Sequence, residues 1–381
     1  MKWLINSVRI FVALLFIFSG LIKANDPLGL SYKMQEFFEV WNFHLLDNFT
    51  LIFSIVMIVF EILAGVALII GWRMKLFSWL LLILIIFFSF LTGYAYLSGK
   101  VRECGCFGNC IPLTAGESFL KDLGLLVLIV FIFFNQEKIK PLIKDLSCIV
   151  LLGLTAVFSF SFQWYVLHHL PVVDCLPYAI GKDIPSQMKI PPGAIQDSTV
   201  ISFVYTKDGK SVEFTADRFP PNFDDSYKFV KRYDKLIRKG NAEPPIKDFI
   251  LISRYGTDTT SELLLQKGFK LFIFSKGIAS QPQDWQKAFS VIFSFAKAKK
   301  LPMYFVTSDF ETVDEWVNKN EIAADLSVLK CDATAVKTAD RSDPTLYLLK
   351  GGIVINKWGE ADFENAIKEI SSLPDSGDQH Q

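Results

Sequence analysis

The chain has 381 residues, and its 39 basic and 39 acidic side chains give a formal net charge of +0. It has no basic stripe of the kind that phosphate contacts require, so we exclude a nucleic-acid-binding function. Hydrophobic residues make up 51% of the chain. They are concentrated in the first half, whereas the second half has the charged composition of a soluble protein. The length suggests two or three domains.

Five apolar stretches are long enough to cross about 30 Å of hydrocarbon. They are Trp3–Ile22, Leu51–Ile70, Leu76–Leu97, Phe119–Phe134 and Cys148–Leu170. The first is interpreted as a retained span rather than a signal peptide, because no small-residue cleavage site follows it and further spans do. The sequence therefore predicts a multi-pass membrane protein that contacts the lipid bilayer.

Positive charge at the span ends predicts the orientation, because loops rich in Lys and Arg stay in the cytoplasm. The turn at residues 71–75 is basic, and the loop at residues 135–147 contains three lysines. We expect both on the cytoplasmic side of the inner (cytoplasmic) membrane. The loop before the fourth span and everything after residue 170 are then extracytoplasmic.

Charged residues lie inside three of the apolar stretches: Arg9 in the first, Glu61 in the second, and Lys121 and Asp122 at the start of the fourth. A charge near the bilayer centre is unfavourable and usually finds a partner inside the helix bundle. Arg9 and Glu61 could approach each other from antiparallel helices. They would form either a buried ion pair that sets the helix register or a proton or cofactor-headgroup site. The sequence identifies no cofactor and does not decide whether the bundle binds a quinone.

The first 135 residues resemble a known family of membrane proteins. Arg9, Phe18–Lys23 and Asp26-Pro27 look like the first span of the DoxX-like family, and Glu61–Leu68 looks like its second. The stretch Cys104–Gly108 is similar to the loop of the methylamine-utilisation MauE branch of that superfamily. The resemblance implies a four-helix membrane bundle, with the fifth span added to reach a soluble domain. It also implies a link to redox chemistry and to the maturation of exported oxidoreductases.

Three of the six cysteines, Cys104, Cys106 and Cys110, lie within seven residues of the loop between the third and fourth spans. Thiolates are nucleophiles in disulfide exchange and also soft metal ligands. Cys104 and Cys106 are too close in sequence for a relaxed disulfide, so a bridge between them would be easily reduced, which suits exchange. Cys110 is better spaced as a partner for either of them, or as a resolving thiol.

A fourth cysteine expected on the same side, Cys175, follows the fifth span and could pair with the loop. Three interpretations stay open for these cysteines. They are redox-active thiols, or they form a structural disulfide within the loop or to Cys175, or they bind a metal with His168, His169 or Cys175. The paired spacing of zinc sites is absent, and no metal is assigned. Cys148 is expected to be an inert apolar filler.

Residues 171–245 are predicted to form an extracytoplasmic linker that carries a hairpin and a helix. Thr199–Thr206 and Ser211–Thr215 alternate on either side of a Lys-Asp-Gly-Lys turn, which predicts the hairpin. Asn222–Lys239 has aromatic residues at helical spacing, which predicts the helix. Residues 246–371 alternate strand and helix patterns, as in a mixed sheet covered by helices. The polar tail, within residues 372–381, is expected to be disordered.

The order of elements in residues 246–371 resembles the thioredoxin-like fold. Asp248–Leu251 looks like its leading strand, and Ser342–Gly352 is similar to its cis-proline strand and hairpin, with Pro344 as the cis residue. That family places a Cys-x-x-Cys pair at a helix N-terminus, which lowers the thiol pKa. The corresponding stretch here, Ser275–Pro282, contains no cysteine. The domain therefore cannot exchange thiols in the family's manner, and Cys331 is expected to be a buried core residue.

The predicted fold is an all-α transmembrane bundle of four helices (residues 1–135), a cytoplasmic loop and an added span (136–170), and an α/β thioredoxin-like soluble domain. We expect a component of extracytoplasmic thiol redox or of the maturation of exported proteins. Cys104, Cys106 and Cys110 would be the thiol centre, and the soluble domain would dock an exported client or a thiol oxidoreductase. The alternative is a non-catalytic, membrane-anchored binding or assembly factor with structural loop cysteines. The sequence does not decide whether the protein is an enzyme.

Overall fold

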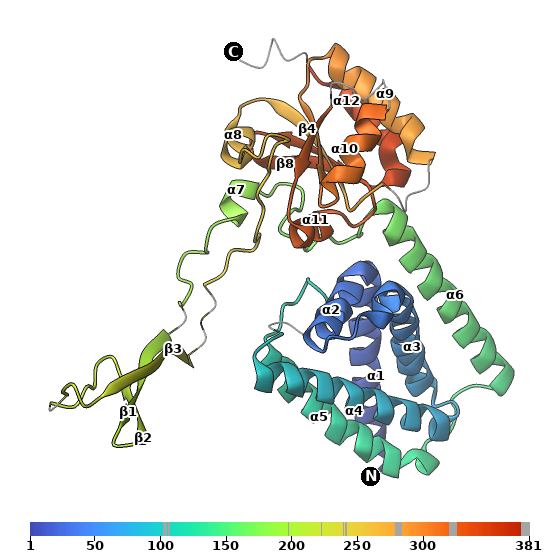
Figure 1. Ribbon diagram of the computed structural model, residues 1–381. Helices are drawn as coiled ribbons and strands as arrows, with labels where there is room; N and C mark the ends of the chain where they lie inside the picture. Colours follow the sequence, from blue (N-terminus) through green and yellow to red (C-terminus); the bar gives the residue numbers. More distant parts are fainter. Residues whose placement is uncertain are drawn as a thin grey trace.

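The computed structural model describes residues 1–374 except 102–104, 106, 197, 222, 239, 241, 279–283 and 320–325, with only the backbone described for 235–238 and 284. A bundle of long helices lies below a domain built on a β-sheet, and a second, smaller sheet stands apart from both (Figure 1). The predicted fold class, a helical membrane part followed by an α/β domain, is confirmed.

The five expected spans form helices α1 (Lys2–Asn25), α3 (Thr50–Ile70), α4 (Met74–Ser98), α5 (Ala115–Phe134) and α6 (Asp145–His169). Among the described residues, four helical stretches are long and apolar enough to cross a membrane: Lys2–Asn25, His44–Ile70, Met74–Ser98 and Asp145–His169. Helix α5 is not one of them, because its first turns contain Glu117, Lys121 and Asp122. It begins at a capping box in which Thr114 and Glu117 satisfy each other's backbone N–H groups.

Glycines set how closely α1 and α3 pack. A Cβ at Gly65 would lie 2.9 Å from the carbonyl oxygen of Ala13, and one at Gly20 would overlap the side chain of Ile62. Small residues at such positions allow helix backbones to approach within a membrane. Helices α4 and α5 complete the core of this bundle, and α6 packs along its outside through Cys148 and Leu152.

A helix outside the apolar stretches connects α1 to α3. Helix α2 (Pro27–Val40) lies between the bundle and the sheet domain, beneath α11 (Ala333–Ala339) (Figure 1). Asp26 caps it by accepting a hydrogen bond from the backbone N–H of Gly29 (3.0 Å), and Pro27 occupies its first turn. The 3-10 helix η1 (His44–Phe49) then leads into α3.

The soluble domain is built on a five-stranded sheet of order β6-β5-β4-β7-β8. Strands β4 (Phe269–Ser275), β5 (Met303–Thr307) and β6 (Ser327–Lys330) are parallel, and β7 (Thr345–Lys350) and β8 (Ile353–Trp358) are antiparallel to their neighbours. Helices pack on both faces of this sheet. They are α7 (Ile184–Gln187), α8 (Thr260–Leu265), α9 (Asp284–Ala298), α10 (Phe310–Lys319), α11 and α12 (Phe363–Ser372), which follows η4 (Glu360–Asp362). This is the thioredoxin-like arrangement.

Alternation along β4 explains the two-sided core. Leu271 and Ile273 pack on the face covered by α9, α10 and α12. Phe272 and Phe274 pack on the opposite face, against α8 and α11. Successive side chains of a strand point to opposite faces, so a strand buried on both faces is apolar throughout. Cys331 is buried in the second of these cores.

The strand-like stretch Asp248–Ser253, whose first four residues resemble a leading strand, does not form a strand. Its residue Ile252 makes single bridges to Lys330 and to Asp258, and the chain then turns back as Ser253 accepts the N–H of Gly256. Phe249 and Leu251 are still buried in the core. Burial therefore produced the strand-like pattern without a ladder of hydrogen bonds.

The predicted helix at Asn222–Lys239 is also wrong. Residues Lys228–Arg238 form strand β3, which pairs antiparallel with β1 (Ser198–Lys207). Strand β2 (Lys210–Thr215) pairs with the other side of β1, where the alternation predicts a hairpin. We call this three-stranded sheet, residues 198–238, the β-arm. The residues of β3 pair with residues of β1 that are distant in sequence. These contacts determine the local structure, although the aromatic residues also have helical spacing.

Candidate functional site

A disulfide joins the cysteine loop to the chain that follows the last membrane helix. Cys110 and Cys175 are bonded, with their Cα atoms 4.9 Å apart, although they are 65 positions apart in sequence. Next to it, the side-chain amide of Asn25 donates to the carbonyl of Val173 (2.8 Å), and its oxygen accepts the N–H of the same residue (2.9 Å). The end of α1, the cysteine loop and the start of the soluble part therefore meet at one surface. Cys104 and Cys106 lie outside the described residues.

Asp26 is the residue at which the loop, α2 and the soluble domain come together. Its carboxylate accepts a hydrogen bond from the side-chain amide of Asn109 (2.9 Å), next to the bonded cysteine. It also forms an ion pair with Arg341, with 3.0 Å between Nε and Oδ1. Both side chains are almost fully buried, at 5% exposed for Arg341 and 10% for Asp26. A charge pair removed from water in this way is strongly directional, so Asp26 fixes how the soluble domain sits on the bundle.

The edge of the soluble domain that contains Pro344 faces α2. The Asp343–Pro344 peptide bond is cis. The hydroxyl of Ser275 donates to the carboxylate of Asp343 (2.9 Å), and Lys276 lies 3.8 Å from Asp340 and 3.7 Å from Asp343. Lys276 thus occupies the region where thioredoxin-like enzymes place their first thiol. Lys276 provides a positive charge in this region, next to two acidic side chains, and no nucleophilic thiol.

Burial and neighbouring charges together set the pKa values in this cluster. Burial raises the pKa of Asp340 well above its ordinary value, and the nearby Asp343 carboxylate raises it further. Burial alone would lower the pKa of Lys276, but Asp340, Tyr32 and Asp343 outweigh it, so the pKa of Lys276 is raised. Lys276 is therefore held in its charged form, whereas burial favours the neutral form of Asp340.

Tyr32 of α2 is inserted into this edge. Three cations surround its ring, with Arg341 at 5.2 Å, Lys337 at 5.5 Å and Lys276 at 5.9 Å from the ring centroid. Lys337 also donates to the side-chain carbonyl of Gln35 (3.3 Å). The pKa of Tyr32 is raised, chiefly by burial. The Pro344 edge of the soluble domain therefore contacts a helix of the same chain.

Further contacts fix the end of α6 to the soluble domain. The hydroxyl of Ser342 donates to the carbonyl of His168 (2.8 Å), and Nδ1 of His169 lies 3.0 Å from Asp362. Lys357 pairs with Asp174 at 2.5 Å. The ring of His169 is engaged in the domain contact, the ring of His168 lies 2.8 Å from the carbonyl of Trp164, and Cys175 is in a disulfide rather than available as a thiolate. Within the described part of the chain, no group of three or more His, Cys, Asp or Glu side chains could hold a metal ion.

The predicted approach of Arg9 to Glu61 is wrong. Glu61 pairs with Lys23 at 2.8 Å and accepts the hydroxyl of Ser19 at 2.9 Å. The glycine contacts place Gly20 against Ile62, which brings the C-terminal end of α1 level with Glu61, whereas Arg9 lies beside Gly71 at the turn before α4. The helix register, which the sequence did not reveal, decided the partner.

The Lys23–Glu61 pair lines a small pocket next to Phe107 of the cysteine loop. This cavity has about 20 Å³, which is room for one water molecule. Lys121 and Asp122 of α5 line it too, and Lys121 also lies 5.1 Å from the ring centroid of Phe107, in the loop. The Lys23–Glu61 and Lys121–Asp122 ion pairs therefore form a polar region at the loop-facing end of an otherwise apolar bundle.

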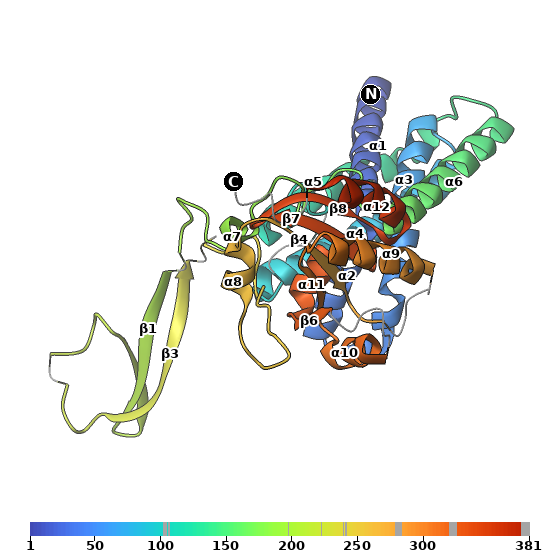
Figure 2. The same ribbon diagram turned by 90° about the horizontal axis from the view of Figure 1, so that it is seen from above.

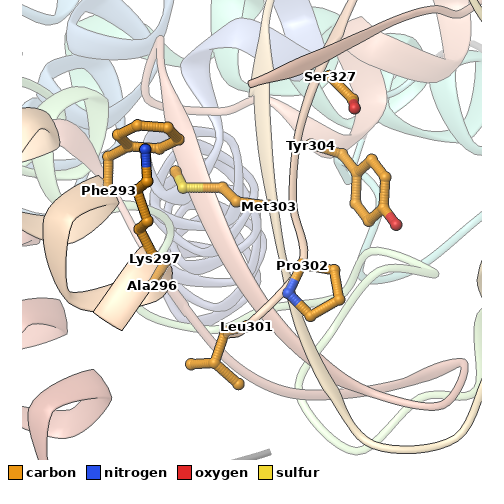
Figure 3. Close-up of a pocket in the computed structure, with 8 residues that line it drawn as sticks. All are labelled: Phe293, Ala296, Lys297, Leu301, Pro302, Met303, Tyr304 and Ser327. Atoms are coloured by element: carbon orange, nitrogen blue, oxygen red, sulfur yellow. The ribbon is translucent and has the colours of Figure 1, made fainter. Parts of the chain in front are cut away.

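A larger pocket, of about 200 Å³, lies on the soluble domain at the opposite end of the parallel strands from Pro344 (Figure 3). Phe293, Ala296 and Lys297 reach it from α9, while residues 301–304 and Ser327 reach it from β5, its preceding turn and β6. It contains none of the residues singled out from the sequence.

The two cysteines outside this assembly are not accessible for exchange. Cys148 and Cys331 are free and buried, and burial raises the pKa of Cys331 to about 12. A thiol of such pKa is almost entirely protonated near neutral pH and a poor nucleophile.

Sequence reasoning missed Asp26, Tyr32, Lys276 and Arg341. Only Asp26 carried a local signal, since Asp followed by Pro is a common helix start. The other three gain their meaning from contacts between residues more than 240 positions apart.

The chain is similar to several known proteins over parts of its length. Residues 1–135 match the family model of the methylamine utilisation protein MauE, and residues 199–239 match a domain of unknown function (DUF8463). Protein TlpB of Flavobacterium psychrophilum is 29% identical over 140 residues, which cover 36% of this chain and only 38% of that relative. The crystal structure of Arabidopsis thaliana ScoI with copper bound aligns with 33% of this chain and 97% of its own, at 17% identity and a TM-score of 0.24.

Proposed function

We propose that this membrane protein takes part in thiol redox or in the maturation of exported proteins, with Cys104 and Cys106 as its reactive thiols. The observation that carries this proposal is the Cys110–Cys175 disulfide. It uses two of the six cysteines, and Cys148 and Cys331 are buried. Cys104 and Cys106 are the two that remain, and they precede the bonded Cys110 by six and four positions in the sequence. The match of residues 1–135 to the MauE family supports a shared membrane scaffold.

The chemistry that suits this pair is thiol–disulfide exchange. A client thiolate attacks a Cys104–Cys106 disulfide, forming a mixed disulfide and releasing one loop thiolate. A second client thiol then attacks the mixed disulfide, so the client gains a disulfide and the loop gains two thiols. Two electrons and two protons pass from client to loop. A bridge between cysteines one residue apart is strained and easily reduced, which favours this direction.

The proposed location is the inner membrane, with the soluble domain and the cysteine loop on the extracytoplasmic side. The basic turn at residues 71–75 and the lysines of the loop at 135–147 support this orientation. The disulfide supports it too, because disulfides persist in oxidising compartments and are rare in the cytosol.

The soluble domain is proposed to hold the loop in place and to present clients through a surface other than the Pro344 edge. That edge contacts Tyr32 and Asp26. A client in the usual position of a thioredoxin-like partner would have to displace α2.

Trapping of mixed disulfides in cells tests this proposal. The single loop thiol left in Cys104→Ser or Cys106→Ser can attack a client disulfide, which is the reverse of the second step and releases one client thiolate. No second loop thiol is then present to release the client, so either variant should accumulate a mixed disulfide with an exported protein. Cys148→Ser is the matched control, because it removes a buried thiol and should trap nothing. Absence of any captured client in both loop variants, with trapping intact for a known oxidoreductase in the same cells, would contradict the proposal.

A second candidate function is a non-catalytic binding or assembly factor. The observation that favours it is the use of the Pro344 edge as a contact within the chain, together with the lack of cysteine at Ser275–Ile278. On this account the double variant Cys104→Ser/Cys106→Ser would still support the maturation of exported proteins. Loss of maturation in that variant would exclude this second function.

A further inference from the structure

The β-arm has no role in the proposed thiol chemistry. It leaves the soluble domain on two connecting segments and stands apart from both the sheet domain and the bundle (Figures 1 and 2). In Figure 1 it runs back toward the level of the helix bundle instead of away from it. In Figure 2 it projects sideways beyond the outline of the bundle. The family match at residues 199–239 covers nearly the same segment, as expected for a unit of its own.

Aromatic rings gather at the distal half of the β-arm. Neighbouring rings have centroids 4.9–6.5 Å apart. The set comprises Phe203, Tyr205, Phe214, Phe219, Phe223, Tyr227 and Phe229. A small sheet without a covering helix needs such a cluster as its core.

Core formation alone does not account for the exposure of these residues. Phe229 is 59% exposed and the adjacent Val230 is 52% exposed. Phe219 and Phe223, from the segment that crosses the aromatic face, are also exposed. A group of large apolar side chains left in contact with solvent marks a surface that binds something apolar.

Lysines and acids border this apolar surface. Asp208 lies in the hairpin turn and Lys207 lies 3.9 Å from Asp224, whereas Lys210 and Lys228 form no ion pair among the described residues. Lys207 lies 4.1 Å from the ring centroid of Tyr227. Lys210 sits across from Lys207 at the hairpin turn, and Lys228 pairs with Thr206 at the start of β3. Both Lys210 and Lys228 are exposed. Aromatic rings bordered by lysines are the composition that settles at a membrane–water interface, where rings lie among headgroups and ammonium groups meet phosphates.

We propose that the distal end of the β-arm binds the headgroup region of the membrane that the chain spans, and that anionic lipids strengthen this binding. The tether favours a lipid surface over a diffusing protein. The Cys110–Cys175 disulfide and the Asp26–Arg341 pair hold the soluble domain on the bundle, so the β-arm is always close to the bilayer. Its sideways projection places it over lipid rather than over the bundle. The proposal does not depend on the thiol chemistry.

Hydrogen–deuterium exchange of the full chain tests this contact. The protein is reconstituted in nanodiscs of phosphatidylcholine, in nanodiscs that also contain phosphatidylglycerol, and in amphipol. Amides of residues 203–231 should exchange most slowly with phosphatidylglycerol and fastest in amphipol. Each lysine near an anionic surface strengthens binding about fivefold, so Lys210→Gln/Lys228→Gln should lower the bound-to-free ratio of the β-arm roughly thirtyfold.

The matched control is Lys182→Gln/Lys189→Gln, which removes two exposed lysines of the soluble domain outside the β-arm and should change nothing. Unchanged exchange of the test variant in amphipol shows that its β-arm is still folded. Phe229→Ser should weaken protection in both kinds of nanodisc. Equal exchange of residues 203–231 in all three environments would overturn the proposal. So would a photo-crosslinker at position 229 that attaches in cells to a protein and not to lipid.

Discussion

Glu61 shows what the sequence reveals about a single residue and what it leaves out. A carboxylate in an apolar helix must find a positive partner, and that much is predictable. Its partner is Lys23 rather than Arg9, because Gly20 and Gly65 fix the register of α1 on α3. Register depends on close packing between two helices, and a single sequence does not display it. The same holds for Arg341, whose meaning comes from Asp26, 315 positions earlier.

Replacing Glu61 by Gln should destabilise the bundle. The substitution leaves the ammonium of Lys23 buried without its counter-ion, and breaking a buried pair in this way costs about 3–5 kcal/mol. Unfolding in mixed micelles measures the loss. Glu36→Gln, which breaks the more exposed pair with Lys33, should cost less than about 1 kcal/mol. Lys23→Met combined with Glu61→Gln should recover much of the stability. Equal effects of the two single variants would show that the Glu61 pair is not structurally important.

Elements with strong local patterns could be predicted, and those that depend on distant partners could not. The long apolar helices and the core strands β4, β5 and β7 formed where their patterns indicated. Strand β3 did not, because its partner β1 lies some 30 residues away and its own aromatics also fit a helix. Asp26-Pro27 is a local start signal for helix α2, since Asp caps the helix and Pro occupies its first turn. The Pro344 turn could be predicted from a resemblance, but its contact with α2 could not.

Asp26 and Arg341 should be energetically coupled across the contact between α2 and the soluble domain. In a double-mutant cycle with Asp26→Asn and Arg341→Gln, residues in direct contact typically show coupling of about 0.5–3 kcal/mol. The cycle cancels the separate losses of the Asp26 cap and of its Asn109 bond. Amide exchange of residues 27–40 reports the opening of this contact.

A matched cycle on the exposed pair of Lys319 and Glu315, on α10, should give coupling near zero. If Asp26 and Arg341 are as independent as that pair, the contact between the bundle and the soluble domain is held by something else.

At the scale of the whole molecule, the structure joins a membrane bundle to a thioredoxin-like domain whose Pro344 edge is in contact with the bundle. The two fold classes could be predicted from apolar runs, element order and resemblance. Their relative position could not, because it rests on the Cys110–Cys175 bond, the Asp26–Arg341 pair and the insertion of Tyr32. In the sequence, Cys104 and Cys106 closely precede Cys110, which is bonded to Cys175.

A redox titration of the full chain in proteoliposomes tests the central claim, that Cys104 and Cys106 are the exchange-active thiols. Alkylation followed by peptide mass spectrometry reports each cysteine across a series of glutathione buffers. We expect Cys104 and Cys106 to change state together, while Cys110 and Cys175 stay bonded to about −300 mV, as structural disulfides do. If Cys110 and Cys175 titrate first, or if Cys104 and Cys106 never form a disulfide, the claim is contradicted.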